Sequence, residues 1–251
     1  DHVGGLASGF SEPGWEWSLE KYYHHWFGRD RHILELIREL ELEDQVIFKT
    51  PVTAVFHEDR FHALDSPMAV LQFPGLPFLD RVRFGALVAF FKLVPDGTFF
   101  EKYRAEEWLI RWAGRRTYDS LWQPMLEGKF GPHYRDVNMA WFWARFKART
   151  QKLGTFEGGF QAFADALANR LRAEGVRIHL ETQVEELGVD GDQPLIRTPG
   201  GQNNFDQVLV TTSPALMSLL TPQLPEGYLS KISNLRSMGA VVLIMALEQP
   251  L

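Results

Sequence analysis

Two pairs of adjacent glycines, Gly4–Gly5 and Gly158–Gly159, are the residues whose spacing first suggests chemistry. The chain opens with DHVGGLASGF, so the first pair lies among small residues, before any segment that could form a core. Glycine permits left-handed backbone conformations and a close approach of the backbone to a ligand. Each pair therefore indicates either a cofactor-binding loop or an ordinary turn, because an isolated glycine motif is compatible with both.

Eight histidines raise the question of a metal site. His24 and His25 are adjacent, so in a strand their side chains point to opposite faces and do not chelate one ion together. His57 and His62 flank a predicted hairpin turn and are expected on one face of it. No third ligand is evident beside them, and we therefore expect no metal site.

The segment 135–152 combines basic and aromatic side chains, and three interpretations of it are considered. It could be a stacking platform for a nucleic acid. It could be an ordinary helix with its basic residues in water and a buried stripe made of Met139, Phe142, Trp143 and Phe146. In the third reading Trp141 and Arg145, four residues apart, line a pocket for a flat apolar substrate that bears carboxylates.

Composition excludes several classes of protein. A net charge of −6 argues against a broad nucleic-acid interface. The absence of cysteine excludes disulfides, thiolate catalysis and cysteine-based metal centres. The longest apolar runs, 84–91 and 238–247, are too short to cross a bilayer. We expect a cytoplasmic protein without a transmembrane segment, and leave peripheral membrane association open.

The first half of the chain predicts strands followed by helices. Asp30 can cap a helix whose buried stripe comprises Ile33, Leu36, Ile37 and Leu40. Residues 45–64 predict short strands with a turn at 58–60. From about Pro67 to Thr150 the pattern is mostly helical, with breaks at 74–77, 95–97 and 128–132.

The second half predicts helices alternating with strands. A helix begins after Gly159 with an inward face made of Phe160, Phe163, Ala164, Leu167 and Leu171. Gly175 should end this helix in the left-handed conformation. We expect strands over 176–180, 183–189 and 194–198, a buried strand over 205–212 that leads into a helix at Pro214, and a strand over the last ten residues.

These ordered blocks resemble a known group of enzymes. The segments GGFQAFADALANRLRAEGVRIHLETQVEEL and FDQVLVTTSP, together with the opening GGLAS, are similar to the flavin-dependent amine oxidase superfamily, which includes protoporphyrinogen oxidases and carotenoid desaturases. The similarity continues more loosely through WSLEKYYHHWFGRDRHILELIRELEL, so that it covers about half of the chain in recognisable blocks. The resemblance rests on the order and spacing of these blocks.

The resemblance implies a set of FAD-binding residues: Gly4, Gly5, Ser8, Gly158, Gly159, Val184, Thr211 and Thr212. In such proteins the first glycine pair lies close to a phosphate or to the ribityl chain. Val184 matches the position whose backbone contacts the adenine, and the two threonines match a strand end near the isoalloxazine. For the substrate, the resemblance and the basic aromatic segment suggest His24, His25, Trp141 and Arg145.

Two positions depart from the pattern of the superfamily. Its members usually have arginine two residues before the first glycine pair, where this chain has His2. Relatives often have glycines before the histidine that corresponds to His24 or His25, whereas Lys21 and Tyr22 stand here.

The dinucleotide-binding signature Gly-x-Gly-x-x-Gly does not occur in the 251 residues. We therefore expect an internal piece of a longer flavoprotein, which by itself holds no FAD and is inactive. The expected fold class is α+β, with a substrate-binding domain of helices over a mixed sheet and an incomplete, Rossmann-like FAD-binding domain. The substrate domain would comprise 11–150 with 222–251, and the partial FAD-binding domain 1–10 with 151–221.

The function implied for the whole protein is FAD-dependent oxidation of a C–N or C–C bond in a largely apolar small molecule. The expected partners do not include nucleic acid, and strand edges left open would favour self-association. Two alternatives remain. A flavin-dependent UDP-sugar mutase would need a cationic pocket for the diphosphate of its substrate, and a non-catalytic interaction domain would need neither cofactor nor substrate.

Overall fold

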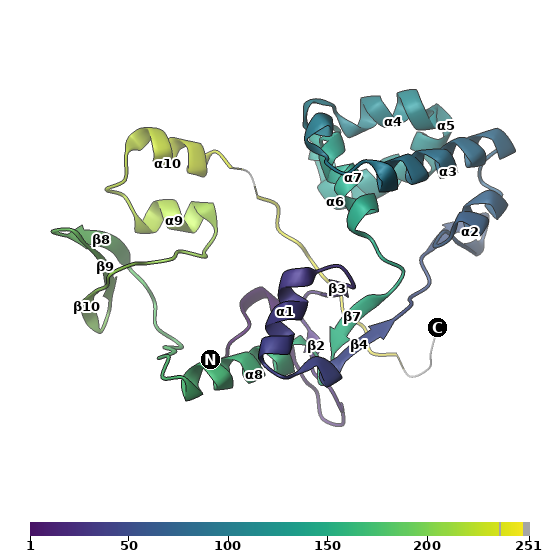
Figure 1. Ribbon diagram of the computed structural model, residues 1–251. Coiled ribbons are helices and arrows are strands. Elements are labelled where there is room, and N and C mark those ends of the chain that lie inside the picture. The colour runs from purple at the N-terminus through teal and green to yellow at the C-terminus, as the bar shows by residue number, and fades with distance from the viewer. Residues whose placement is uncertain (236, 248–251) are drawn as a thin grey trace.

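The computed structural model describes residues 1–235 and 237–247, which form three groups of elements (Figure 1). Helices α2–α7 form a helical group, and α1, α8 and the strands β1–β4 and β7 form a central group. Strands β8–β10 with α9 and α10 form a third group, which Figure 1 shows on the opposite side of the view from the helical group. The expected combination of helices and sheets is confirmed.

The helical group follows the breaks predicted from proline and glycine. Its helices are α2 (Pro67–Gln72), α3 (Phe78–Leu93), α4 (Ala105–Ala113), α5 (Arg115–Thr117), α6 (Gln123–Phe130) and α7 (Met139–Ala148). Single 3₁₀ turns at Thr98–Lys102 and Gly131–Asp136 and a π-helical turn at Tyr118–Trp122 connect them. Ser66 and Asn138 cap α2 and α7, because their side-chain oxygens accept hydrogen bonds from the amides of Ala69 and Trp141.

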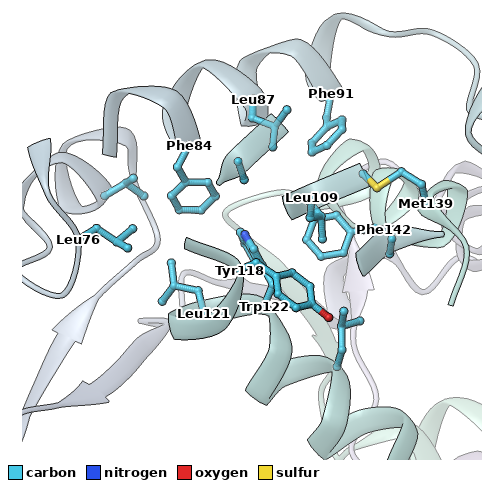
Figure 2. Packing of buried hydrophobic residues seen from close by; sticks show 14 of the residues in the cluster. Leu76, Phe84, Leu87, Phe91, Leu109, Tyr118, Leu121, Trp122, Met139 and Phe142 are labelled. Atoms are coloured by element: carbon cyan, nitrogen blue, oxygen red, sulfur yellow. The ribbon is translucent and has the colours of Figure 1, made fainter. Parts of the chain in front are cut away.

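A continuous aromatic core holds these helices together (Figure 2). Phe91 of α3, Leu109 of α4 and Phe142 of α7 are almost completely buried in it. The ring of Trp122 packs edge-on against Phe84 and Phe142, at centroid distances of 5.1 and 4.9 Å. Burying one such side chain contributes about 1.5–3 kcal/mol, so this core is the main source of stability for the group.

The central group is built on the antiparallel sheet β3–β7–β4. Its elements are β1 (Gly9–Phe10), β2 (Leu19–Glu20), β3 (Trp26–Phe27), α1 (Arg31–Glu39), β4 (Val46–Lys49), β7 (Leu153–Phe156) and α8 (Phe160–Ala173). Trp26, Ile37 and Phe156 bury against Phe160 and Phe163 of α8. Segments separated by more than a hundred residues therefore share one core.

Two predictions about the ends of helices have opposite outcomes. Gly175 has φ +87° directly after α8, as predicted for a left-handed terminating residue. Asp30 precedes α1 but does not cap it, because its carboxylate accepts a hydrogen bond of 2.8 Å from the amide of Phe27 instead.

A hairpin of β5 (Ala54–His57) and β6 (Arg60–Ala63) precedes the helical group. Its turn residues Glu58 and Asp59 have φ values of +49° and +58°. Positive φ at both central residues is the geometry of a tight two-residue hairpin turn. The predicted turn at 58–60 is confirmed.

The third group contains β8 (Glu186–Asp190), β9 (Gln193–Thr198) and β10 (Gly201–Asn204), followed by α9 (Pro214–Leu220) and α10 (Glu226–Ser233). Ser213 caps α9 by accepting a hydrogen bond from the amide of Leu216. Leu187, Leu195 and Leu220 are buried, and α9 contacts β8. The predicted helix at Pro214 is confirmed.

Three predicted strands are wrong in the described residues. Residues 176–180, 205–212 and 242–247 form no strand, and Leu209 in the second of them is 88% exposed rather than buried. Residues 248–251 of the predicted last strand lie outside the described residues. A strand needs a neighbouring strand for its hydrogen bonds, and none pairs with these segments in the part of the chain that the structure describes.

The sheet arrangement also differs from the prediction. Between residues 1 and 247, with position 236 excepted, every strand pairing is antiparallel, so the expected mixed sheet is not observed. Within the same residues no helix is long and apolar enough to span a bilayer.

Candidate functional site

The two glycine turns are held together by contacts between the opening segment and the start of α8. The backbone amide and side-chain hydroxyl of Ser18 both donate to the carbonyl oxygen of Gly158, at 3.3 and 2.8 Å. The amide of Phe160 donates to Oε1 of Glu20 at 2.9 Å. Residues 140 positions apart in sequence thus form one site.

Gly159 is required by this packing. Its φ of +87° and ψ of 174° belong to a region that essentially only glycine occupies. A Cβ atom there would lie 2.5 Å from the carbonyl oxygen of Ser18. The carboxylate of Glu20 accepts from the first amide of α8 and lies at the positive end of the helix dipole. Gly159 therefore serves the junction between two parts of the chain.

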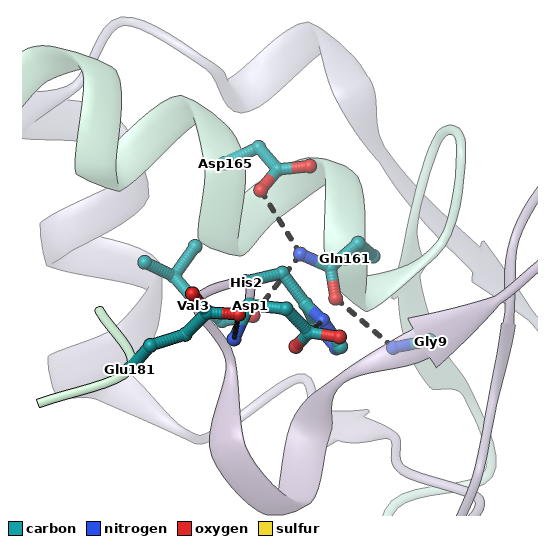
Figure 3. Close-up of polar contacts among 7 residues, drawn as sticks. All are labelled: Asp1, His2, Val3, Gly9, Gln161, Asp165 and Glu181. Atoms are coloured by element: carbon teal, nitrogen blue, oxygen red, sulfur yellow. Dashed lines mark hydrogen bonds and ion pairs between the residues drawn. The ribbon is translucent and has the colours of Figure 1, made fainter. Parts of the chain in front are cut away.

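Gln161 fastens the opening segment to α8, as Figure 3 shows. Its amide oxygen accepts a hydrogen bond of 3.1 Å from the amide of Gly9. Its amide nitrogen donates to the carbonyl of Val3 at 3.1 Å and to Oδ1 of Asp165 at 2.9 Å. Gln161 is not among the site residues that the sequence predicts. The available signal was a glutamine directly behind the Gly-Gly turn, with an acid four positions on the same helix face.

In the opening turn Gly4 packs against Ser8, whereas Gly5 faces open space. Gly4 and Gly5 have φ values of +114° and +54°, and the amides of Ala7 and Ser8 donate back to their carbonyls. A Cβ atom on Gly5 would meet nothing within 4 Å. Ser8 is buried, and its carbonyl accepts from the amide of Lys21. A rigid glycine backbone with free space in front of it fits the close approach of a phosphate or ribityl chain.

His2, at the position where relatives have arginine, contacts Asp1, with 2.5 Å between its Nδ1 and a carboxylate oxygen of Asp1 (Figure 3). The N-terminal ammonium lies 3.9 Å from Oε1 of Glu181.

His24 and His25 face opposite ways, as predicted for adjacent residues of an extended segment. The ring of His24 lies 5.7 Å from that of Phe160, in the central core. His25 stacks on Tyr23 at 6.3 Å and meets Phe27 edge-on at 5.0 Å. The two histidines therefore serve different surroundings.

His25 and Arg145 of the predicted substrate set are brought near each other. Burial lowers the pKa of His25, and the positive charges of Arg145 and Arg149 lower it further, while Asp30 opposes them. The guanidinium of Arg145 lies over the ring of Trp141 at 5.6 Å. Three of the four predicted substrate residues are thus linked by contact or by charge.

The stripe predicted for residues 139–146 is confirmed. Met139 and Phe142 are buried, whereas Trp143 and Phe146 are partly buried against the same core. Arg145 is exposed, as the wet face of that helix requires.

His57 and His62 lie on one face of their hairpin, as predicted, with ring centroids 6.2 Å apart. Both rings pack against Phe73, at 5.4 and 5.7 Å. No group of three or more potential metal ligands occurs among residues 1–235 and 237–247. Their packing against Phe73 explains the pair without a ligand.

The remaining predicted flavin contacts lie in or before the third group. Val184 is half-buried just before β8, and Thr211 and Thr212 are exposed before α9. Figure 1 shows β8 and α9 well apart from the N-terminal end of the chain and α8. The structure therefore brings together the two glycine turns but does not bring these three residues to them.

Solved structures with the same fold are described as oxidases, as an oxidoreductase and as a fatty acid isomerase. A protein assigned as a protoporphyrinogen oxidase from Exiguobacterium sp. 255-15 matches with a TM-score of 0.65 and 18% identity, over 92% of this chain and 56% of its own. An oxidoreductase from Methanosarcina mazei matches with a TM-score of 0.71 and 16% identity, over 93% of this chain and 58% of its own. Cyclohexylamine oxidase from Brevibacterium oxydans IH-35A matches with a TM-score of 0.63 and 14% identity, over 93% of this chain and 56% of its own.

These matches define a fold, and the chain spans a little over half the length of each matched structure. No curated protein matches it. The model of the family described as flavin containing amine oxidoreductase matches residues 1–251. The chain belongs to that family, and the superfamily resemblance inferred from its sequence is confirmed.

Proposed function

We propose that this chain is part of an FAD-dependent oxidoreductase that oxidises a C–N or C–C bond of a largely apolar small molecule. One observation carries the proposal: Ser18, Glu20 and Gln161 join the Gly4–Gly5 turn to the Gly158–Gly159 turn. The backbone of Gly5 is left open to a ligand at this junction. Membership of the flavin containing amine oxidoreductase family supports flavin as that ligand.

In this proposal each residue of the junction has a definite role. The backbone of Gly4 and Gly5 lies against the phosphate or ribityl part of FAD, and the buried Ser8 fixes the end of the turn. A bound flavin supplies the acceptor for the electrons of the substrate. The protein orients the substrate and excludes water, which is the task we assign to the helical group with its aromatic core.

The division into 11–150 with 222–251 and 1–10 with 151–221 stays a prediction. The core that Trp26 and Ile37 form with Phe160 favours counting residues 26–37 with the flavin-binding part. The names of the similar structures include a protoporphyrinogen oxidase and a cyclohexylamine oxidase, which suggests porphyrinogens and amines as the first compounds to test.

The experiment that tests the proposal is purification of the complete gene product, followed by its visible absorption spectrum. A yellow protein that releases FAD on denaturation, and whose flavin bleaches with an amine, a porphyrinogen or a polyene, supports the proposal. A colourless protein that takes up no added FAD contradicts it.

A further inference from the structure

A cluster of cationic side chains lies where α3 and α7 end, beside the segment that links β3 to α1. We call it the cationic cluster, and its members are Arg29, Lys92, Arg145, Lys147 and Arg149. Nζ of Lys92 donates to the carbonyl of Arg149 at 2.7 Å, and Nζ of Lys147 donates to the carbonyl of Lys92 at 2.8 Å. Arg149 donates to the hydroxyl of Thr53. Direct contacts thus join Lys92, Lys147 and Arg149, while the charge of Arg29 reaches Lys92 and that of Arg145 reaches His25.

These cations form no ion pair with a carboxylate in the described part of the chain, residues 1–235 and 237–247. None of the five cations lies within 4.0 Å of an acidic group there, although ion pairs are frequent elsewhere on the surface. The nearby Asp30 accepts a hydrogen bond from the amide of Phe27 and offsets only part of this charge, as the acidic group that opposes Arg145 and Arg149 at His25. A chain with a net charge of −6 thus has a local excess of positive charge.

Capping explains two of the cations. The ammonium groups of Lys92 and Lys147 satisfy carbonyls at the ends of α7 and α3, where the helix dipole favours positive charge. It does not explain Arg29, Arg145 or Arg149, which add charge to a site that is already positive. Lys92 is affected by this excess of positive charge. Burial lowers its pKa, and the charges of Arg29, Lys147 and Arg149 lower it further.

Aromatic side chains line the neighbourhood of the arginines. Arg145 lies over the ring of Trp141, which meets Phe130 edge-on at 4.8 Å. His25, whose pKa burial and the charges of Arg145 and Arg149 lower, stacks on Tyr23 and meets Phe27 edge-on. Cations beside partly buried rings and the exposed ring of Tyr23 suit a ligand that combines a flat apolar body with negative charge.

The cluster lies at the opposite end of β7 from the glycine turn. Phe27 pairs with Leu153 at the start of β7, and the residues of the cluster lie before that point, whereas Gly158 follows its end. β7 runs from Leu153 to Phe156 at about 3.3 Å per residue, so its two ends lie about 10 Å apart. An anion at the cluster therefore lies at the other end of β7 from the Gly158–Gly159 turn.

From these observations we propose that the cationic cluster binds an anionic group, a carboxylate or a phosphate, of the substrate. The assignment of this anion to the substrate rests on the proposed function. The binding of an anion by the cluster does not depend on it. The same field repels a protonated amine, so the site favours an anionic substrate over a polyamine. In a sugar-nucleotide mutase the bound anion would be the diphosphate of the substrate. With a porphyrinogen-type substrate it would be a carboxylate.

The test is a calorimetric titration of the chain at low ionic strength with two probes, pyrophosphate and the aromatic dicarboxylate phthalate. The variants are Arg145→Gln and Arg149→Gln. The control is Arg172→Gln, an exposed arginine of α8 that contacts Asn169. Circular dichroism establishes that each variant folds. Nuclear magnetic resonance of the His25 ring gives a second readout that a purely structural role for the arginines would not move.

We expect saturable binding of at least one probe, about tenfold weaker in each cluster variant and unchanged in the control. The bound anion should raise the pKa of His25. Binding of pyrophosphate alone indicates a phosphate-bearing substrate, and binding of phthalate alone indicates a carboxylate. Absence of saturable binding of both probes, or equal weakening in the Arg172 control, overturns the proposal. The titration needs neither bound flavin nor catalytic turnover. Its result therefore does not depend on whether the complete protein is a flavin-dependent oxidoreductase.

Discussion

The amide of Phe160, the first residue of α8, donates a hydrogen bond of 2.9 Å to the carboxylate of Glu20, 140 positions earlier in the chain. This contact supplies the cap that Gly159 lacks a side chain to provide, and it also fixes the opening segment on the helix. Local stability and the assembly of the candidate flavin site therefore depend on the same atoms.

Removing this cap should destabilise the protein. Glu20→Ala leaves the amide of Phe160 without its acceptor and should lower the free energy of unfolding by about 1–2 kcal/mol. Urea denaturation measures the change. Glu16→Ala, at an exposed position four residues earlier, is the control and should change stability little. Equal effects of the two substitutions would refute a capping role for Glu20.

The two glycine turns should respond differently to the same substitution. Gly159→Asn places a Cβ against the carbonyl of Ser18 in a conformation only glycine adopts, and should cost about 3 kcal/mol. Gly5→Asn adds a side chain in open space at φ +54°, which asparagine tolerates, and should cost about 1 kcal/mol or less. Thermal unfolding followed by circular dichroism compares them. Similar losses would contradict the distinction drawn here between a packing glycine and a ligand-facing one.

Gln161 should control the order of the opening segment. Gln161→Leu removes the bonds to Gly9 and Val3, so the amides of residues 3–9 should exchange hydrogen faster while the body of α8 is unchanged. Asp165→Ala removes only the remaining partner of Gln161 and leaves both bonds to the opening segment. Hydrogen exchange read by mass spectrometry checks this. The clamp is disproved if exchange over residues 3–9 is the same in both variants.

His25 should make stability depend on pH. Its pKa in the folded protein is below the ordinary value of 6.5, because burial and Arg145 disfavour the charged ring. The unfolded chain therefore binds more protons, and stability is full above about pH 6.5 and falls as the pH drops toward the lowered pKa. Unfolding free energies between about pH 5 and 8 measure this. His25→Gln should flatten part of that slope; an unchanged slope would rule out the assignment to His25.

Segments without strand partners should promote association. Leu209 is 88% exposed in the stretch 205–212, which has the composition of a buried strand. Such a segment pairs readily with another chain, so light scattering should show a mass that rises with concentration. Leu209→Lys should reduce this effect. A strictly monomeric species at high concentration would speak against the proposal.

The sequence predicted best those features that local chemistry determines. Proline and glycine set the breaks of the helical group, Gly175 ends α8, and the stripe with Met139 and Phe142 is buried. Periodicity and backbone freedom are properties of neighbouring residues, so a short window of sequence contains them.

Features that need distant partners were beyond that window. Asp30 matches the pattern of a helix cap, yet its carboxylate serves the amide of Phe27. The segment 205–212 is typical of a strand, but a strand depends on a neighbour that sequence patterns do not identify. Gln161 went unnoticed because its two partners in the opening segment lie more than 150 positions away.

The most direct test of the central claim is the amount of flavin bound by the complete protein with and without Gly5→Asn. If the backbone of Gly5 lies against the cofactor, the wild type should carry flavin, and the variant should carry less than about a tenth of it at a similar unfolding midpoint. Flavin retained at the wild-type level in the folded variant would contradict the account, because the opening turn would then not contact the cofactor.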